Sequence, residues 1–243
     1  MIRTHARILV FLLAAACRSG SGPSELGPGE PIPQASLRTT SGEIAIGNFE
    51  AELASDRRRL DARGGSVAQR ASIIERVGFR GRILARIADL EEARRLAEDL
   101  VTGNPDDPQA RMARAGALAA LHRFDEAMSD LEQVESRRGA RRATRFARAS
   151  ILTARGRSDE ALPLLEPEVE RRPDLDSLGA LATLRAERGE LAEASRLFVA
   201  AARAYRDVSP FPIASIEHQR GRMWLRAGDL DRARPLLEAA LLR

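Results

Sequence analysis

The 243-residue chain contains no lysine, one cysteine and few aromatic side chains, and these shortages limit its possible functions. All 39 basic residues are arginine, which stays charged to very high pH and explains a sequence pI near 10.5. The formal net charge is only +4, and it falls to +2 without residues 1–16, which hold two arginines and no acid. Nucleic-acid-binding proteins usually carry a larger, clustered basic excess, so we expect no nucleic-acid partner.

The sequence also lacks the residue groupings on which catalytic and metal sites depend. Its three histidines, His5, His122 and His218, are isolated from one another, and no His, Cys and Asp cluster has metal-ligand spacing. No glycine-rich loop follows a strand pattern, so a phosphate cradle is not indicated. We therefore predict no catalytic residue, no metal site, no cofactor and no enzymatic activity.

A repeated phrase organises the rest of the chain. An alanine recurs in DLEEA, RFDEA, RSDEA, ELAEA and DLDRA, first at intervals of 34 residues, then 33, then 39. These alanines are Ala93, Ala127, Ala161, Ala194 and Ala233. A fixed period of 20–50 residues indicates stacked supersecondary units, each too small to bury its apolar face alone.

With this period and these small residues, the chain resembles the tetratricopeptide repeat family. The resemblance implies an all-α, right-handed α-solenoid of helix-turn-helix units over residues 74–243. The five units are predicted at about 74–107, 108–141, 142–174, 175–208 and 214–243. The first helix of each unit carries a small residue at Gly81, Ala115, Ala149, Ala182 and Gly221. The turn within each unit carries Ala88, His122, Gly156, Gly189 and Gly228.

Three segments depart from the regular pattern. Residues 38–73 are predicted as an N-terminal helical segment over the first unit, with Gly64–Gly65 as a break; a decayed sixth repeat is the alternative. Pro167 is expected to kink the second helix of the third unit. Residues 205–212 carry five extra residues between the last two units and are expected to lengthen a loop or a helix end.

The N-terminus has the pattern of an export signal. Residues 1–16 combine a basic start, an apolar run and a small-residue exit, and they are too short for a membrane span. Cys17 follows directly, an arrangement similar to the bacterial lipobox, although the usual leucine stands one place early, at Leu13. The resemblance implies lipidation of Cys17; the alternative is simple cleavage with a free thiol.

Residues 17–37 are rich in Gly, Pro and Ser and are predicted as a flexible linker between a lipid and the folded domain. We therefore expect an exported protein that touches the membrane only through its lipid anchor. Because Arg18 rather than aspartate follows the cysteine, the enterobacterial sorting pattern implies the periplasmic side of the outer membrane.

The family resemblance also implies a concave groove lined by the first helix of each unit. Mapping the groove positions onto this chain gives the candidate contact residues Gln109, Met112, Phe146, Ser150, Thr153, Asp176, Thr183, His218 and Arg222. The alternative for Met112 and Phe146 is that they belong to the core. A protein or peptide partner is expected in this groove.

The last helix is apolar on more than one side. Repeat arrays usually end in a helix with a polar outer face, whereas this chain ends at PLLEAALLR. Leu236, Leu241 and Leu242 are therefore candidate contacts for a second copy of the chain or for the partner.

A cluster of arginines at 137, 138, 141, 142, 145 and 148 remains. It could bind an acidic partner, but we favour a solvated face neutralised by Glu132 and Glu135. The resulting hypothesis is a lipid-anchored protein-interaction scaffold of the bacterial cell envelope. The alternatives are a periplasmic holdase-type chaperone and an accessory subunit of an envelope enzyme.

Overall fold

A computed structural model of the chain describes residues 27, 29–33, 39–138 and 141–243, which form eleven helices and no strand. The helices are α1 (Gly42–Arg63), α2 (Val67–Ile83), α3 (Ile87–Gly103), α4 (Pro108–Ala120), α5 (Phe124–Arg138), α6 (Arg142–Ala154), α7 (Ser158–Arg171), α8 (Leu175–Glu187), α9 (Leu191–Ala204), α10 (Phe211–Arg226) and α11 (Leu230–Leu241). Within the described ranges, none of them is both long and apolar enough to span a bilayer.

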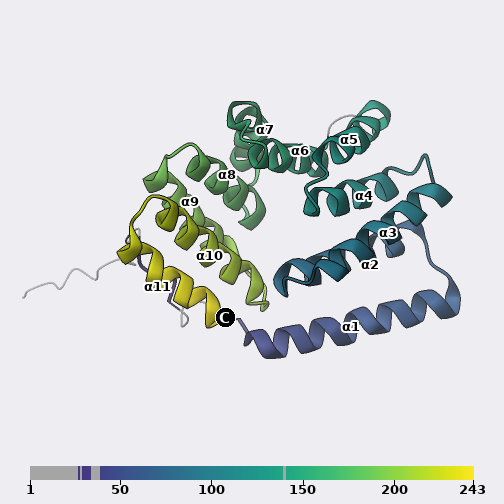
Figure 1. Cartoon of the computed structure of the whole chain (residues 1–243), viewed down its shortest axis with the longest axis horizontal. Coiled ribbons are helices and arrows are strands. Elements are labelled where there is room, and N and C mark those ends of the chain that lie inside the picture. The colour runs from purple at the N-terminus through teal and green to yellow at the C-terminus, as the bar shows by residue number, and fades with distance from the viewer. Residues whose placement is uncertain (1–26, 28, 34–38, 139–140) are drawn as a thin grey trace, which may run out of the picture.

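Ten of these helices pair into five antiparallel hairpins that stack in an arc, from α2–α3 through α6–α7 to α10–α11 (Figure 1). Helix α1 stands alone and packs on α2. It runs along the open side of the arc, from beside the C-terminus to the far end of the first hairpin (Figure 1). The predicted all-α, tetratricopeptide-like solenoid is confirmed.

Local capping chemistry explains where the first hairpin begins. Gly64, with a φ of 67°, ends α1, and Ser66 then forms a capping box with Gln69 that starts α2. Helix α2 consequently begins at Val67, earlier than the predicted start of the first unit at residue 74. The extra residues between the last two units form the loop from Tyr205 to Pro210, and α10 starts at Phe211.

The repeated alanines are buried where the two helices of each hairpin pack together. All five are at most 2% exposed. In the facing helices, a β-carbon added to Gly81 would lie 2.8 Å from the Leu90 side chain, and one added to Gly221 would lie 2.6 Å from Leu237. Larger side chains at these places would push the two helices of a hairpin apart.

The turn inside every hairpin has the same geometry. A backbone N–H just after the turn donates to a carbonyl five residues earlier, as in the bond from Arg86 to Gly81 at 2.9 Å. The residue preceding that donor has a positive φ, and in the five hairpins it is Ala85, His122, Gly156, Gly189 and Gly228. The sequence prediction of Ala88 for the first turn is wrong, because α3 begins about one helical turn earlier than the spacing indicated.

Ala85 has a φ of 52°, a conformation that a residue with a β-carbon adopts at a cost of about 1 kcal/mol. We expect Ala85→Gly to stabilise the protein by up to ~1 kcal/mol, measured as an increased urea midpoint. The matched control is Ala88→Gly, which lies inside α3 and should destabilise. Equal effects of the two substitutions would contradict the positive-φ assignment.

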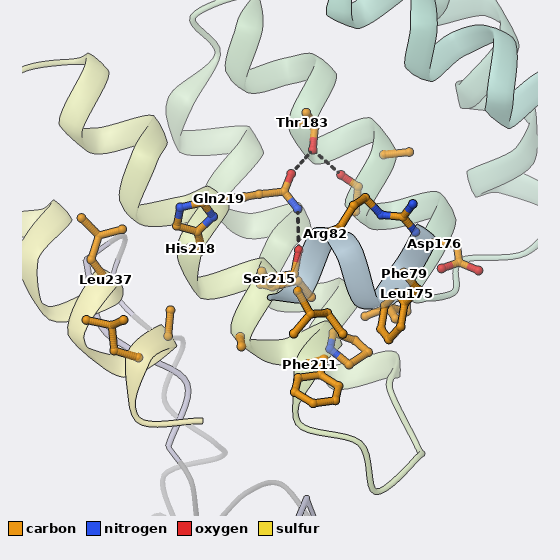
Figure 2. A pocket seen from close by; sticks show the side chains of 18 residues that line it. Phe79, Arg82, Leu175, Asp176, Thr183, Phe211, Ser215, His218, Gln219 and Leu237 are labelled. Atoms are coloured by element: carbon orange, nitrogen blue, oxygen red, sulfur yellow. Dashed lines mark hydrogen bonds between the residues drawn. The ribbon is translucent and has the colours of Figure 1, made fainter. Parts of the chain in front are cut away.

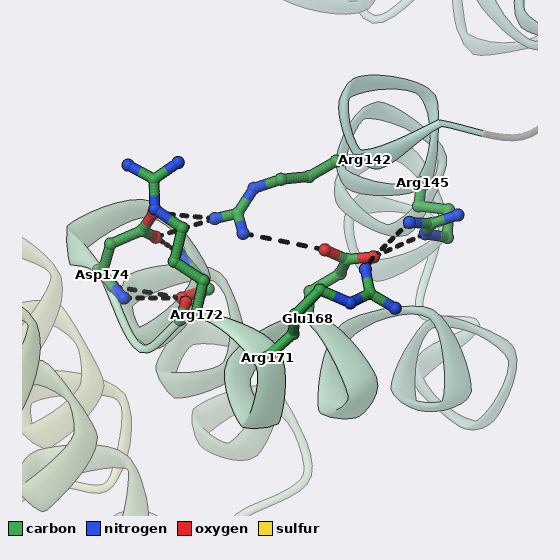
Figure 3. Close-up of polar contacts among 7 residues, drawn as sticks. Arg142, Arg145, Glu168, Arg171, Arg172 and Asp174 are labelled. Atoms are coloured by element: carbon green, nitrogen blue, oxygen red, sulfur yellow. Dashed lines mark hydrogen bonds and ion pairs between the residues drawn. The ribbon is translucent and has the colours of Figure 1, made fainter.

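The arginine cluster is used in ion pairs between helices (Figure 3). Glu168 of α7 is 1% exposed and accepts hydrogen bonds from Arg145 of α6 at 2.7 Å and from Arg171 at 2.9 Å. Arg142 donates to Asp174, at the start of α8, at 2.8 Å. These bonds join α6, α7 and α8, so the cluster has a structural role in this part of the array.

Further contacts complete the neutralisation of the cluster. Arg148 pairs with Glu135 at 2.7 Å, as the sequence indicated, and Arg137 pairs with Asp106. The exposed Glu132 has no such pair among the described ion pairs. Glu168 and Asp174 lie 23 and 32 residues along the chain from the arginines that they bind, so sequence proximity did not indicate them.

Burial opposes the ionisation of Glu168, but its bonds and charge interactions with Arg145 and Arg171 outweigh burial and lower its pKa below the ordinary 4.5. A lowered folded-state pKa adds stability above pH 4.5, and this stability is lost as the pH falls through the folded-state value. We expect Glu168→Gln to cost about 2 kcal/mol at pH 7. The difference between variant and wild type in urea unfolding should shrink below pH 4.5, and a difference independent of pH would contradict this account.

The predicted linker contains a segment that packs on the last repeat. Ile32 is 5% exposed and belongs to a buried cluster with residues of α8, α9 and α10. Thr40 donates from its backbone to the carbonyl of Val208 at 2.8 Å. The low apolar content of residues 17–37 did not predict this contact, because a single isoleucine makes it.

Candidate functional site

A large concavity of the described structure lies where the two ends of the array meet. Its volume is about 840 Å³, within the usual size of a small-ligand or peptide pocket. Residues from α2, α8, α10 and α11 line it, with Phe79 and Phe211 on one side and Leu237 on another (Figure 2). The first and last hairpins therefore contribute to one site.

Aromatic contacts hold these two ends together. The rings of Phe79 in α2 and Phe211 at the start of α10 have centroids 6.2 Å apart in an edge-to-face arrangement. Phe49 of α1 also contacts Phe79, and the centroids of these two rings are 5.6 Å apart. Such pairs add about 0.5–1.5 kcal/mol each beyond their burial. The three rings join α1, α2 and α10 beside the pocket.

A chain of hydrogen bonds crosses one wall of the pocket. The hydroxyl of Thr183 in α8 donates to Oε1 of Gln219 in α10 at 2.6 Å, and Nε2 of Gln219 lies 3.3 Å from the Ser215 hydroxyl, to which it donates (Figure 2). The chain fixes the spacing of α8 and α10. It also places polar atoms on an otherwise largely apolar surface, where they can orient a ligand.

Three kinds of ionisable side chain lie at the pocket. Burial lowers the pKa of Arg82, although a guanidinium remains charged at neutral pH. Asp176 supplies a carboxylate. Burial, together with the charge of Arg222, lowers the pKa of His218 below 6.5, so its imidazole is neutral at pH 7. The lining thus combines a guanidinium, a carboxyl group and an imidazole.

The predicted groove residues fall into two sets, and the first set lines two adjoining pockets. Asp176, Thr183 and His218 line the large pocket, and Arg222 lines an adjoining pocket of about 390 Å³. Among the described residues, no group of three or more His, Cys, Asp and Glu side chains is arranged to hold a metal ion.

The candidates from the second and third units lie elsewhere. Gln109 and Ser150 are exposed, and the half-buried Thr153 donates its hydroxyl to the carbonyl of Ala149 at 2.8 Å. Met112 and Phe146 are half-buried against the apolar cores of their own repeats. The guanidinium of Arg142 also covers the Phe146 ring at 4.9 Å. The core interpretation of Met112 and Phe146 therefore fits the structure better than the groove interpretation.

Sequence reasoning missed the aromatic wall of the pocket. One repeat period before Met112 lies Gly78, next to Phe79, so extending the groove positions into the first unit would have pointed to this region. Phe211 lies at the end of the extra residues and has no counterpart in the other units. Its position depends on the curvature of the whole array.

The three leucines of the last helix differ in exposure. Leu236 is fully buried with Trp224 and Ala233, so it is a core residue and is not available as a contact. Leu241 and Leu242 are 87% and 79% exposed, and Leu241 also lies at the mouth of the large pocket. The predicted apolar strip is reduced to these two side chains.

Comparisons with known proteins identify the fold. No family model matches the chain, and no curated protein matches its sequence. Cut9–Hcn1, an APC/C hetero-tetramer, gives a TM-score of 0.61 at 17% identity, covering 82% of this chain and 37% of the other. This chain thus spans well under half of that protein.

Two bacterial structures are of more similar length. A tetratricopeptide repeat protein from Parabacteroides merdae gives a TM-score of 0.58 at 16% identity, covering 81% of this chain and 79% of the other. A thermophilic TPR protein, TTC0263 from Thermus thermophilus, gives a TM-score of 0.55 at 18% identity, covering 82% of this chain and 94% of the other. The five hairpins and these likenesses establish that the chain has a tetratricopeptide-like fold.

Proposed function

We propose that the protein is an interaction scaffold that binds an apolar segment of a partner protein in the pocket between α2, α8, α10 and α11. The observation that carries the proposal is the composition of this pocket, which combines a volume of about 840 Å³ with aromatic and aliphatic walls and a few polar groups. This combination is typical of sites that bury a ligand and orient it through few hydrogen bonds.

The pocket favours a ligand whose apolar side chains are grouped on one side. Phe79, Phe211 and Leu237 supply apolar surface, while Thr183 and Gln219 already hydrogen-bond to each other. One turn of an amphipathic helix, or a short extended segment, has this division of surfaces. Most of the lining is apolar, so binding is a better account of the pocket than catalysis.

We further propose that the scaffold is exported and anchored to the cell envelope by a lipid on Cys17. The support is the pattern of residues 1–17, which lie outside the described residues. An outer-membrane location on the periplasmic side follows from Arg18 in the same reasoning. The described helices would then work close to the membrane surface and contact a protein partner there.

The pocket can be blocked without disturbing the core. Gly179 of α8 lines the pocket, and a β-carbon added there meets no atom within 4 Å. We expect Gly179→Leu to reduce partner binding at least tenfold and to leave thermal stability equal or higher, since glycine weakens a helix. Affinity capture from a membrane fraction, followed by binding measurements on the captured protein, tests this.

The matched control for this variant is Gly47→Leu, in an equally open position on α1 and outside the pocket. Gly116→Leu on α4 reports whether the ligand also reaches the second repeat. Retained binding by Gly179→Leu would contradict the pocket as the site. Many unrelated captured proteins would favour the holdase alternative, and a single co-purifying enzyme would favour the accessory-subunit alternative.

Lipidation is tested separately. Cells fed a labelled fatty acid should incorporate the label into the wild-type protein and not into Cys17→Ser, because that substitution removes the thiol that receives the lipid. The unaltered partner binding of Cys17→Ser in detergent extract serves as the control for folding. Equal label on both proteins, or none on either, would rule out the anchor.

A further inference from the structure

The docked segment Gly29–Pro33 contacts an unusual group of buried charges in the last repeat. Glu217 and Arg220 of α10 have side chains that are 0% exposed, and they pair with each other at 3.0 Å. Both also bind the main chain of the docked segment. Glu217 accepts the Ile32 N–H at 2.5 Å, and Arg220 donates to the Glu30 carbonyl at 3.1 Å. Arg243 donates to the Ile32 carbonyl at 2.7 Å.

We propose that these charges and the apolar cluster beside them form a second binding site, specific for an extended proline-containing peptide, which residues 29–33 of the same chain occupy. The site goes beyond the proposed function. It lies on the side of α10 that carries Glu217 and Arg220, and of its apolar cluster Leu175 and Ile216 also line the large pocket.

Each residue of the segment has a property that the site requires. A β-carbon on Gly29 would lie 2.8 Å from the Arg232 side chain, so only glycine permits this approach. Glu30 closes a turn by accepting the Gly27 N–H at 2.9 Å. Pro31 and Pro33 flank Ile32, restrict the backbone to extended conformations and carry no N–H that would need a partner.

Ile32 is the anchor of the segment. Its side chain completes a buried cluster with Leu178, Phe198, Ile213 and Ile216, from three helices of the last two hairpins. Its backbone N–H and carbonyl are both bound by charged side chains. Charge-assisted bonds to the main chain are stronger than neutral ones and do not depend on the side chain that the peptide carries. The charged side chains therefore recognise an extended backbone, and the apolar cluster recognises a branched aliphatic side chain.

A buried ion pair is poor evidence for a purely structural role, because apolar residues of similar volume usually stabilise a core at least as well. Burial raises the pKa of Glu217, while the Ile32 N–H and Arg220 oppose this rise. The carboxylate thus depends in part on the segment for its stabilisation.

Because the chain's own segment occupies the site, a separate peptide should bind the wild-type chain only weakly. The segment is followed closely by Thr40, which is bonded to the loop before α10. A short tether of this kind gives an effective concentration on the order of millimolar. An added peptide therefore competes only when the chain's own segment is disabled.

The test uses a fluorescent synthetic peptide of residues 26–34 and the full chain. We expect at least tenfold tighter binding to Ile32→Asp than to the wild type, because the aspartate removes the anchor from the apolar cluster. Glu217→Gln in the Ile32→Asp background should weaken binding at least fivefold. A peptide that itself carries aspartate in place of Ile32 should not bind. Equal binding to both chains, or none to a folded Ile32→Asp chain, would overturn the proposal.

Hydrogen exchange in the wild-type chain tests the same idea without a destabilising substitution. If the segment is a bound ligand, the Ile32 amide should exchange through local release, at least tenfold faster than the Phe198 amide and with little dependence on denaturant. Glu217→Gln should accelerate exchange at Ile32 alone. Exchange of both amides at one rate that follows global unfolding would show that the segment is an integral part of the core, and would overturn the proposal even if Ile32→Asp failed to fold.

Discussion

The close approach of paired helices at small residues is the constraint on which the rest of the structure depends. The alanine that opens the second helix of each hairpin is almost fully buried, and Gly81 and Gly221 face the neighbouring helix where a side chain would collide. This approach brings the side chains that stand four residues after four of these alanines into contact with the preceding helix. They are Leu131, Leu165, Phe198 and Leu237. Because this contact recurs in each hairpin, the hairpins stack on one another in an arc (Figure 1).

The arc produces a contact between the first and last hairpins that no single repeat could make. It brings α2 back to α10, so that Phe79 meets Phe211 and the first and last hairpins enclose one pocket. Helix α1 crosses the open side and adds Phe49 to the same contact. The pocket is therefore a property of the number of repeats and their rotation. A change in packing between any two hairpins would alter its shape even without altering its lining.

Arginine supplies much of the polar contact between helices. Buried acids in each half of the array are bound by guanidinium groups from a neighbouring helix, as Asp89 is by Arg80 and Glu168 is by Arg145. The forked guanidinium can hold both carboxylate oxygens, a geometry that lysine does not offer. A chain that has only arginine as its base thus gains directional contacts between helices.

The sequence by itself determined the five hairpins, because the period of 34 residues and the buried alanines follow from local helix geometry and need no knowledge of the final arrangement. It also named Asp176, Thr183 and His218, which the structure places in the lining of the large pocket. Tertiary structure alone decided that Phe79 and Phe211 share a pocket, since that contact depends on the summed rotation of all repeats. It likewise decided that Ile32 is buried beside Glu217, because a contact across 185 residues leaves no periodic signal in the sequence.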